Sequence, residues 1–151
     1  VSLQPLVAMC FSGKYTKQDI MNFIRGKGGL VAHLGTADAI EVERRIREGD
    51  QHAKLVYDGM LYSCARALGG LAAAADGKVD RVILTGGLAH SKYVVEYLTR
   101  KLSFIAPVEV MAGEFELEAL AAGALRALRG EEPIKTYTGV NVFQGFDYLK
   151  P

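Results

Sequence analysis

The clearest indication of the fold is the segment Val82-Ile83-Leu84-Thr85-Gly86-Gly87-Leu88-Ala89-His90-Ser91. Its first half is apolar and β-branched, which is typical of a buried strand, and a Gly-Gly pair follows. We predict a strand over 79–85 and a helix over 91–102, separated by the glycine turn. A strand over 107–111 and a helix over 114–129 come next. This strand–helix–strand–helix order indicates a parallel α/β sheet.

The sequence upstream of this stretch predicts helices, because apolar residues recur there at helical spacing. We expect Thr16 (with Asp19 in a capping box), Thr36 and Asp50 to cap the starts of three of these helices. The short apolar segment 30–35 fits either a strand or a buried loop. The predicted helices lie at 3–11, 16–24, 37–48 and 50–75.

Helical spacing also predicts which side chains are buried. In the helix over 37–48, we expect Ile40 to face inward. The charged residues of that helix should form a solvated face: Glu41, Glu43, Arg44, Arg45 and Arg47.

Small residues and cysteines carry two further packing predictions. Gly59, Gly69 and Gly70 interrupt the longest helix, and each costs about 1 kcal/mol relative to alanine. Close packing against another helix would explain them. Cys10 and Cys64 lie far apart among apolar residues, so we expect buried, reduced thiols rather than a disulfide.

The composition bounds the class of protein. The 151 residues fit one domain, and 50% of them are hydrophobic, which is enough for a packed core. The 18 Lys and Arg against 17 Asp and Glu leave a charge of +1, which gives no general attraction to nucleic acid or anionic membranes. No apolar run reaches the length of about 18 residues that spans a bilayer. We expect a cytoplasmic protein without nucleic-acid or membrane partners.

The glycine turn is the best candidate for ligand binding. Ligands of open α/β sheets bind at the carboxyl ends of strands. Gly86 and Gly87 lack Cβ atoms, so a flat ring or a ribose could lie against their backbone, and the next helix offers free N–H groups. An ordinary tight strand-to-helix turn explains the same residues.

Three other features have a structural and a functional interpretation. Thr36 and Asp38 fit a helix start, and they equally fit a ligand-binding turn. The acidic residues at 114, 116 and 118 suit a helix dipole better than a metal site. The small residues of 119–127 indicate tight packing or a hinge contact between domains.

Taken together, several segments resemble the butyrate kinases of the acetokinase family. This family belongs to a superfamily with an actin-like, ribonuclease H-like ATPase fold. The resemblance extends to about Glu131 and implies two related α/β domains with the nucleotide between them. This chain would be a partial second domain, rich in helices with parallel strands. The segments that carry the resemblance are 10–16, 28–38, 82–91, 103–108 and 113–126.

The resemblance implies transfer of phosphate from ATP to butyrate or a branched short-chain fatty acid, giving an acyl phosphate and ADP, with Mg²⁺ as the usual metal. Thr36 and Asp38 match a helix start that contacts the nucleoside, where the carboxylate can accept hydrogen bonds from ribose. The slim helix around Gly123 matches a connecting helix that packs during domain closure. Phe115 stands where close relatives are expected to have an acid, so no metal ligand is assigned. The residues that match the adenosine-binding motif are Gly86, Gly87, Leu88, Ala89 and Ser91.

The resemblance also implies that much of the enzyme lies outside this sequence. Residues 1–130 match the nucleotide-binding C-terminal part, and residues 131–151 form a tail without a match. The family's phosphate loops and its catalytic Arg and His lie upstream of the matched part, so we assign no catalytic residue. Two strands are also too few for a covered parallel sheet, and the sequence starts at Val1. We therefore expect a fragment that is inactive alone, from an enzyme that forms homo-oligomers.

Two alternatives remain open. One is a non-catalytic nucleotide-binding or oligomerisation module that is naturally this short. The other is the corresponding part of an acetate or propionate kinase.

Overall fold

The computed structural model describes residues 3–140. The chain divides into two compact units, Val1–Glu114 and Phe115–Pro151, and each unit is described by itself.

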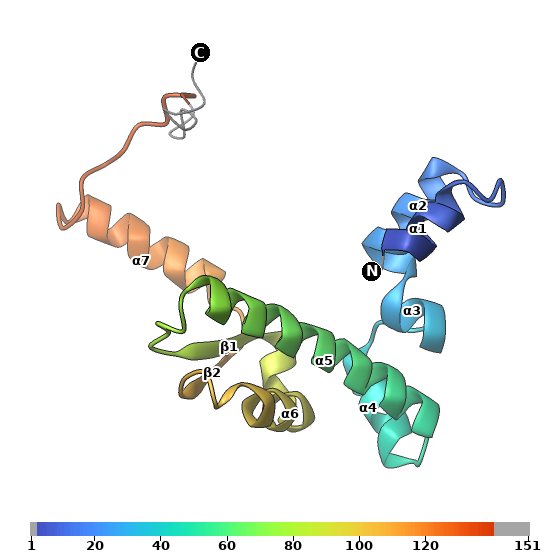
Figure 1. Ribbon diagram of the computed structural model, residues 1–151. Coiled ribbons are helices and arrows are strands. Elements are labelled where there is room, and N and C mark those ends of the chain that lie inside the picture. The colour runs from blue at the N-terminus through green and yellow to red at the C-terminus, as the bar shows by residue number, and fades with distance from the viewer. Residues whose placement is uncertain (1–2, 141–151) are drawn as a thin grey trace. The chain divides into compact units, whose positions relative to one another are not determined.

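The first unit begins with helices (Figure 1). Thr16 caps the second of them and forms the predicted capping box with Asp19. Asp50 caps the longest one, where its side chain accepts a hydrogen bond from the Ala53 N–H at 2.9 Å. The elements are α1 (Leu3–Cys10), α2 (Lys17–Asn22), a π-helical turn (Phe23–Lys27), α3 (Gly29–Leu34), α4 (Ala39–Arg47) and α5 (Gln51–Ala74).

The second half of this unit is the predicted parallel pair of strands. β1 (Val82–Gly86) and β2 (Val108–Ala112) pair so that their first residues lie opposite each other, as do their last. A single 3₁₀ turn (Gly87–His90) and α6 (Lys92–Leu102) connect the two strands. The strand–helix–strand order inferred from the sequence is therefore confirmed.

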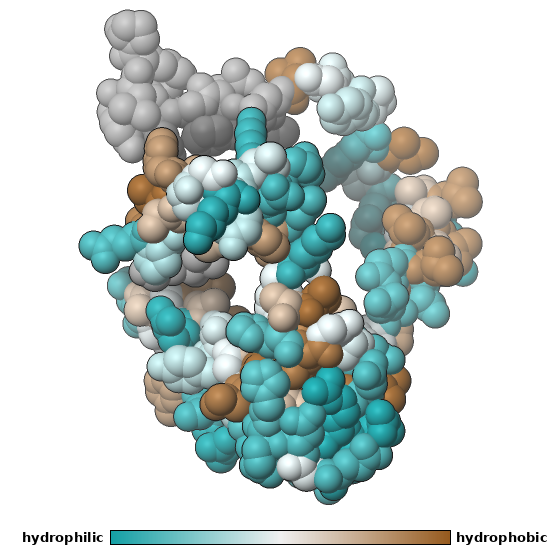
Figure 2. Space-filling view, turned by 90° about the vertical axis from the view of Figure 1, so that its right-hand side faces the viewer, coloured by the Kyte–Doolittle hydropathy of each residue, from teal (hydrophilic) through white to brown (hydrophobic). Residues whose placement is uncertain are grey.

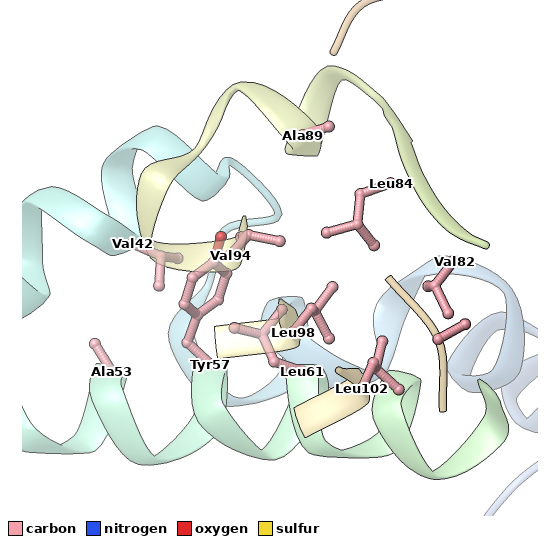
Figure 3. Packing of buried hydrophobic residues seen from close by; sticks show 11 residues of the cluster. Val42, Ala53, Tyr57, Leu61, Val82, Leu84, Ala89, Val94, Leu98 and Leu102 are labelled. Carbon is pink, nitrogen blue, oxygen red and sulfur yellow. The ribbon is translucent and has the colours of Figure 1, made fainter. Parts of the chain in front are cut away.

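One hydrophobic cluster joins α4, α5, α6 and the sheet (Figure 3). Alternation along β1 turns Val82 and Leu84 into this cluster, while Ile83, on the other face, is 54% exposed. The cluster fixes β1 and the start of α6 against α5. Its buried members are Val42, Ala53, Tyr57, Leu61, Val82, Leu84, Ala89, Val94, Leu98, Leu102 and Ala106.

Segment 30–35, expected as a strand or a buried loop, is helical. It belongs to α3, which Gly28 precedes in an extended conformation and Gly35 ends with a left-handed φ of 75°. A glycine at this position is the common end of a helix because it carries no Cβ that would clash. Six residues are too few to show a helical period in the sequence.

The predicted orientation of α4 is wrong at Ile40, which is 79% exposed. Ala39, Val42 and Ile46 contact the core instead, because they lie on one helical face. Glu41 and Glu43 lie on either side of Val42 and are both half-buried, so neither belongs to the predicted solvated face.

Arg45 also departs from the solvated face. Its guanidinium donates hydrogen bonds to Asp50 at 2.8 and 3.0 Å and to the Leu34 carbonyl at 3.1 Å. It therefore connects α4 to the ends of the two neighbouring helices.

The predicted close packing at the glycines of α5 and the predicted burial of the cysteines are also wrong within residues 3–140. A Cβ placed on Gly59, Gly69 or Gly70 would meet no other atom within 4 Å. Cys10 and Cys64 carry free thiols as predicted, but both are exposed. Hydrophobic side chains are visible among hydrophilic ones on the face drawn in Figure 2. The small and apolar residues around these positions form surfaces that no other segment of residues 3–140 covers.

The second unit contains α7 (Glu116–Leu128), which confirms the last predicted helix. Residues 131–140 contain neither helix nor strand, and the rest of the predicted tail lies outside the described residues. No helix among residues 3–140 has the length and apolar character needed to cross a membrane.

Candidate functional site

The glycine turn leaves open space above its backbone. Gly86 has a φ of 79°, a left-handed conformation that strains residues with a side chain. A Cβ built on Gly86 or on Gly87 would find no atom within 4 Å. The turn thus presents bare backbone at the carboxyl end of β1, where a flat ligand could lie.

A second glycine turn is hydrogen-bonded to the first. The Gly86 N–H donates to the Gly113 carbonyl at 3.1 Å, and the Gly113 N–H donates to the Gly86 carbonyl at 3.2 Å. Gly113 directly follows β2 and has a φ of 111°. The two strands therefore end in adjoining backbone turns at one edge of the sheet.

The side chains of the 3₁₀ turn point in different directions. Ala89 is buried in the hydrophobic cluster and holds the turn against the core (Figure 3). Leu88 is 46% exposed, and His90 is exposed as well. Of the residues matched to the adenosine motif, Gly87 and Leu88 are thus exposed, Gly86 is half-buried like Ser91, and Ala89 is buried.

Ser91 is engaged within the protein. Its hydroxyl accepts a hydrogen bond from the Val94 N–H at 3.1 Å and so caps α6, which begins close to the predicted start at residue 91. The same hydroxyl donates to Glu43 at 2.5 Å. Ser91 therefore connects the start of α6 to α4.

Asp38, rather than Thr36, caps α4. The Asp38 carboxylate accepts a hydrogen bond from the Ile40 N–H at 2.9 Å through Oδ1. Thr36 accepts one from the Asp38 N–H at 3.1 Å and so shapes the turn ahead of the helix. Among the described residues, Oδ2 of Asp38 has no hydrogen-bond partner, and the side chain is exposed. This oxygen is available to a ligand hydroxyl.

Glu43 is the residue of this region that the sequence interpretation missed. Its Oε1 accepts hydrogen bonds from both Ser91 and the Tyr57 hydroxyl, the latter at 3.0 Å. Burial, reinforced by this bond to a carboxylate, raises the pKa of Tyr57 well above its ordinary value. Glu43 follows Val42, which is buried in the structure, but the sequence prediction turned Ile40 inward instead and so gave no signal for Glu43. Through Glu43, the helix that starts at Asp38 is joined directly to the turn that contains Ser91.

A second polar region lies between α5 and α6 and lines an open depression of about 360 Å³. Asp58 accepts hydrogen bonds from Lys54 at 2.5 Å and from Tyr93 at 2.6 Å. Burial tends to raise the pKa of Asp58, but these two donors together outweigh it, and its pKa is lowered. These charged groups are paired with each other, which is typical of a structural network.

The described residues do not form a metal centre by themselves. Mg²⁺ requires several oxygen ligands in nearly octahedral geometry. Within residues 3–140 there is no group of three His, Cys, Asp or Glu side chains that could hold a metal ion. We therefore derive no chemical step through a metal from these residues.

Comparison with known proteins identifies relatives of this chain. The sequence model of the acetokinase family matches residues 9–112. A probable butyrate kinase of Bacteroides thetaiotaomicron is 47% identical over 132 residues, butyrate kinase 2 of Clostridium acetobutylicum is 49% identical, and probable butyrate kinase 2 of Caldanaerobacter subterraneus subsp. tengcongensis is 52% identical. Each alignment covers 87% of this chain and 37% of the relative, so the chain spans little more than a third of their length.

A solved structure resembles the fold. The crystal structure of Porphyromonas gingivalis acetate kinase matches with a TM-score of 0.72 at 21% sequence identity. The match covers 85% of this chain and 38% of that one. It confirms the predicted fold class. The helices and parallel strands described above correspond to part of the acetate kinase fold.

Proposed function

Since the chain belongs to the acetokinase family, we propose that it forms the adenosine-binding side of a kinase that acts on short-chain fatty acids. The kinase transfers the terminal phosphate of ATP to butyrate or a branched analogue. An oxygen of the carboxylate bonds to phosphorus, the bond to ADP breaks, and an acyl phosphate forms. Relatives named as butyrate kinases at 47–52% identity support this substrate class.

The open turn at Gly86 and Gly87 is the observation that carries the proposal. Adenine and ribose lie against this backbone, where no side chain occupies the space. The free Oδ2 of Asp38 accepts a hydrogen bond from a ribose hydroxyl. Adenosine is uncharged, so a segment with a net charge of +1 suits this part of the ligand.

The groups that act on the phosphates lie in the part of the kinase that this chain does not match. Phosphoryl transfer depends on positioning and on stabilising charge around the transferred group. The described residues bind and orient the nucleoside, and residues outside this chain supply Mg²⁺ coordination and charge stabilisation. By this proposal, the chain alone is inactive, and the complete kinase is a cytoplasmic homo-oligomer.

An acyl-hydroxamate assay tests the proposal. The complete kinase should form acyl phosphate from ATP with butyrate or isobutyrate, and less readily with acetate or propionate. The 151-residue chain should form none. Robust turnover by the chain alone would contradict the assignment of the catalytic groups to the remaining part.

Calorimetry and light scattering separate this function from that of a non-catalytic module. The exposed apolar side chains of α5, among them Leu55 at 72% and Leu71 at 65%, also suit an assembly surface. A stable, well-folded chain that binds ADP tightly as a defined oligomer, with no activity in any longer form, would favour the module.

A further inference from the structure

One carboxylate oxygen joins three helices beside the glycine turn. Oε1 of Glu43, on α4, accepts hydrogen bonds from Ser91 at the start of α6 and from Tyr57 on α5. Tyr57 is fully buried, and Glu43 and Ser91 are half-buried. Hydrogen bonds to a charged acceptor in such surroundings are among the stronger ones in proteins.

The direction of the protons makes this arrangement specific. A carboxylate has no proton to donate, so both hydroxyls must donate to it. The only hydroxyl proton of Ser91 is then directed at Glu43, while its lone pair faces the Val94 N–H. Ser91 therefore has no proton left for a nucleotide, and its contribution is to hold the turn in place.

Glu43 also lies on the helix that Asp38 begins. Because α4 is a regular helix, the position of Asp38 relative to Glu43 is fixed. The hydrogen bond from Glu43 to Ser91 therefore fixes Asp38 relative to the end of the glycine turn.

We propose that Glu43 is a positioning residue for the nucleotide: it holds the Asp38 turn and the Gly86–Ser91 turn in the arrangement in which one nucleoside contacts both. This inference rests on the proposed function, because it presumes that adenosine lies on these two turns. Glu43 itself touches no ligand. Without it, only a fraction of the molecules would hold both turns in place, and the apparent Kd would rise by the inverse of that fraction.

Steady-state kinetics of the complete kinase test this role. Glu43→Ala should raise the KM for ATP and the Kd for ADP about tenfold, while kcat stays within about twofold, because the lost interaction stabilises ground state and transition state equally. Glu43→Gln keeps an oxygen acceptor at the same position and should restore both constants to within about threefold. Glu43→Asp keeps the charge but withdraws the oxygen by one carbon, so it should behave like the alanine variant, and it serves where that variant folds poorly.

Tyr57→Phe is the matched control for a merely structural role. It removes the other hydrogen bond to the same oxygen and leaves the one from Ser91. The thermal midpoint should fall, and the KM for ATP should stay within about twofold. Two results would overturn the positioning role. One is a KM for ATP that rises equally in Tyr57→Phe and Glu43→Ala. The other is a KM that stays unchanged in Glu43→Ala and Glu43→Asp.

Gly87→Val distinguishes the failure of this inference from that of the proposed function. If this variant loses ADP binding while the Glu43 variants keep it, only the positioning role is wrong. If a folded Gly87→Val variant binds ADP normally, the placement of adenosine is wrong, and the role of Glu43 is overturned with it.

Discussion

The substitution Gly87→Val tests the surface on which adenosine is proposed to lie. A Cβ at this position meets no atom within 4 Å, so the larger side chain fits the folded protein. The left-handed φ belongs to Gly86, and position 87 accepts a side chain without that strain. The cost to folding should therefore remain below about 1 kcal/mol, the range of ordinary propensity differences.

The cost to nucleotide binding should be much larger. The isopropyl group would stand in the space where the base and ribose approach the backbone. If about 120 Å² of apolar ligand surface is lifted away, the loss at about 25 cal/mol per Å² is about 3 kcal/mol. This corresponds to a Kd raised by roughly 150-fold.

Calorimetry with ADP on the complete kinase measures this effect, and circular dichroism verifies that the variant is folded. Gly87→Ala is the graded control, because a single methyl group should weaken binding less than the isopropyl group does. A folded Gly87→Val variant with unchanged ADP affinity would refute the placement of adenosine on this turn.

Three further variants address neighbouring groups. Asp38→Asn keeps a good helix cap but offers a ribose hydroxyl one acceptor fewer, so thermal stability should be unchanged while the Kd for ADP rises about tenfold; an unchanged Kd would remove Asp38 from the site. Ser91→Ala removes the cap of α6, and urea unfolding should show a loss of about 1 kcal/mol or more; unaltered stability would contradict the observed capping. The pKa of Asp58 is lowered from its ordinary value of 3.8 in the folded protein. The ionised carboxylate therefore stabilises the fold fully at pH values above 3.8, and this stabilisation is lost as the pH falls through the folded-state pKa. Urea unfolding of Asp58→Asn should therefore show a weaker loss of stability between pH 5 and 2 than the natural chain does, and equal losses would contradict this assignment.

The sequence predicted the elements whose signals are local. A β-branched run that ends in Gly86 specifies β1, and Ser91 caps the next helix with its own side chain. Thr16 and Asp50 likewise act on N–H groups only a few residues away. Such signals do not depend on the rest of the fold, so they can be recognised in one sequence.

Other features depend on tertiary contacts and could not be predicted in this way. In α4, which starts at Ala39, Val42 faces inward and Ile40 is exposed. The sequence prediction started this helix two residues earlier and placed Ile40 on the inward face. Glu43 appears as one charge among many on a polar helix, and its role depends on Tyr57 and Ser91, which come from distant parts of the chain. The proposed nucleotide-binding role itself rests on the resemblance, because a Gly-Gly turn alone also fits an ordinary connection.

Photoaffinity labelling can show whether adenosine lies on the glycine turn. Arg81 and Lys92 flank the turn, so trypsin releases residues 82–92 as one peptide. After illumination of the complete kinase with an azido derivative of ADP, mass spectrometry should find the label on this peptide, and excess ADP should prevent it. If ADP prevents labelling at other sites and no label is found on residues 82–92, adenosine does not lie on the glycine turn.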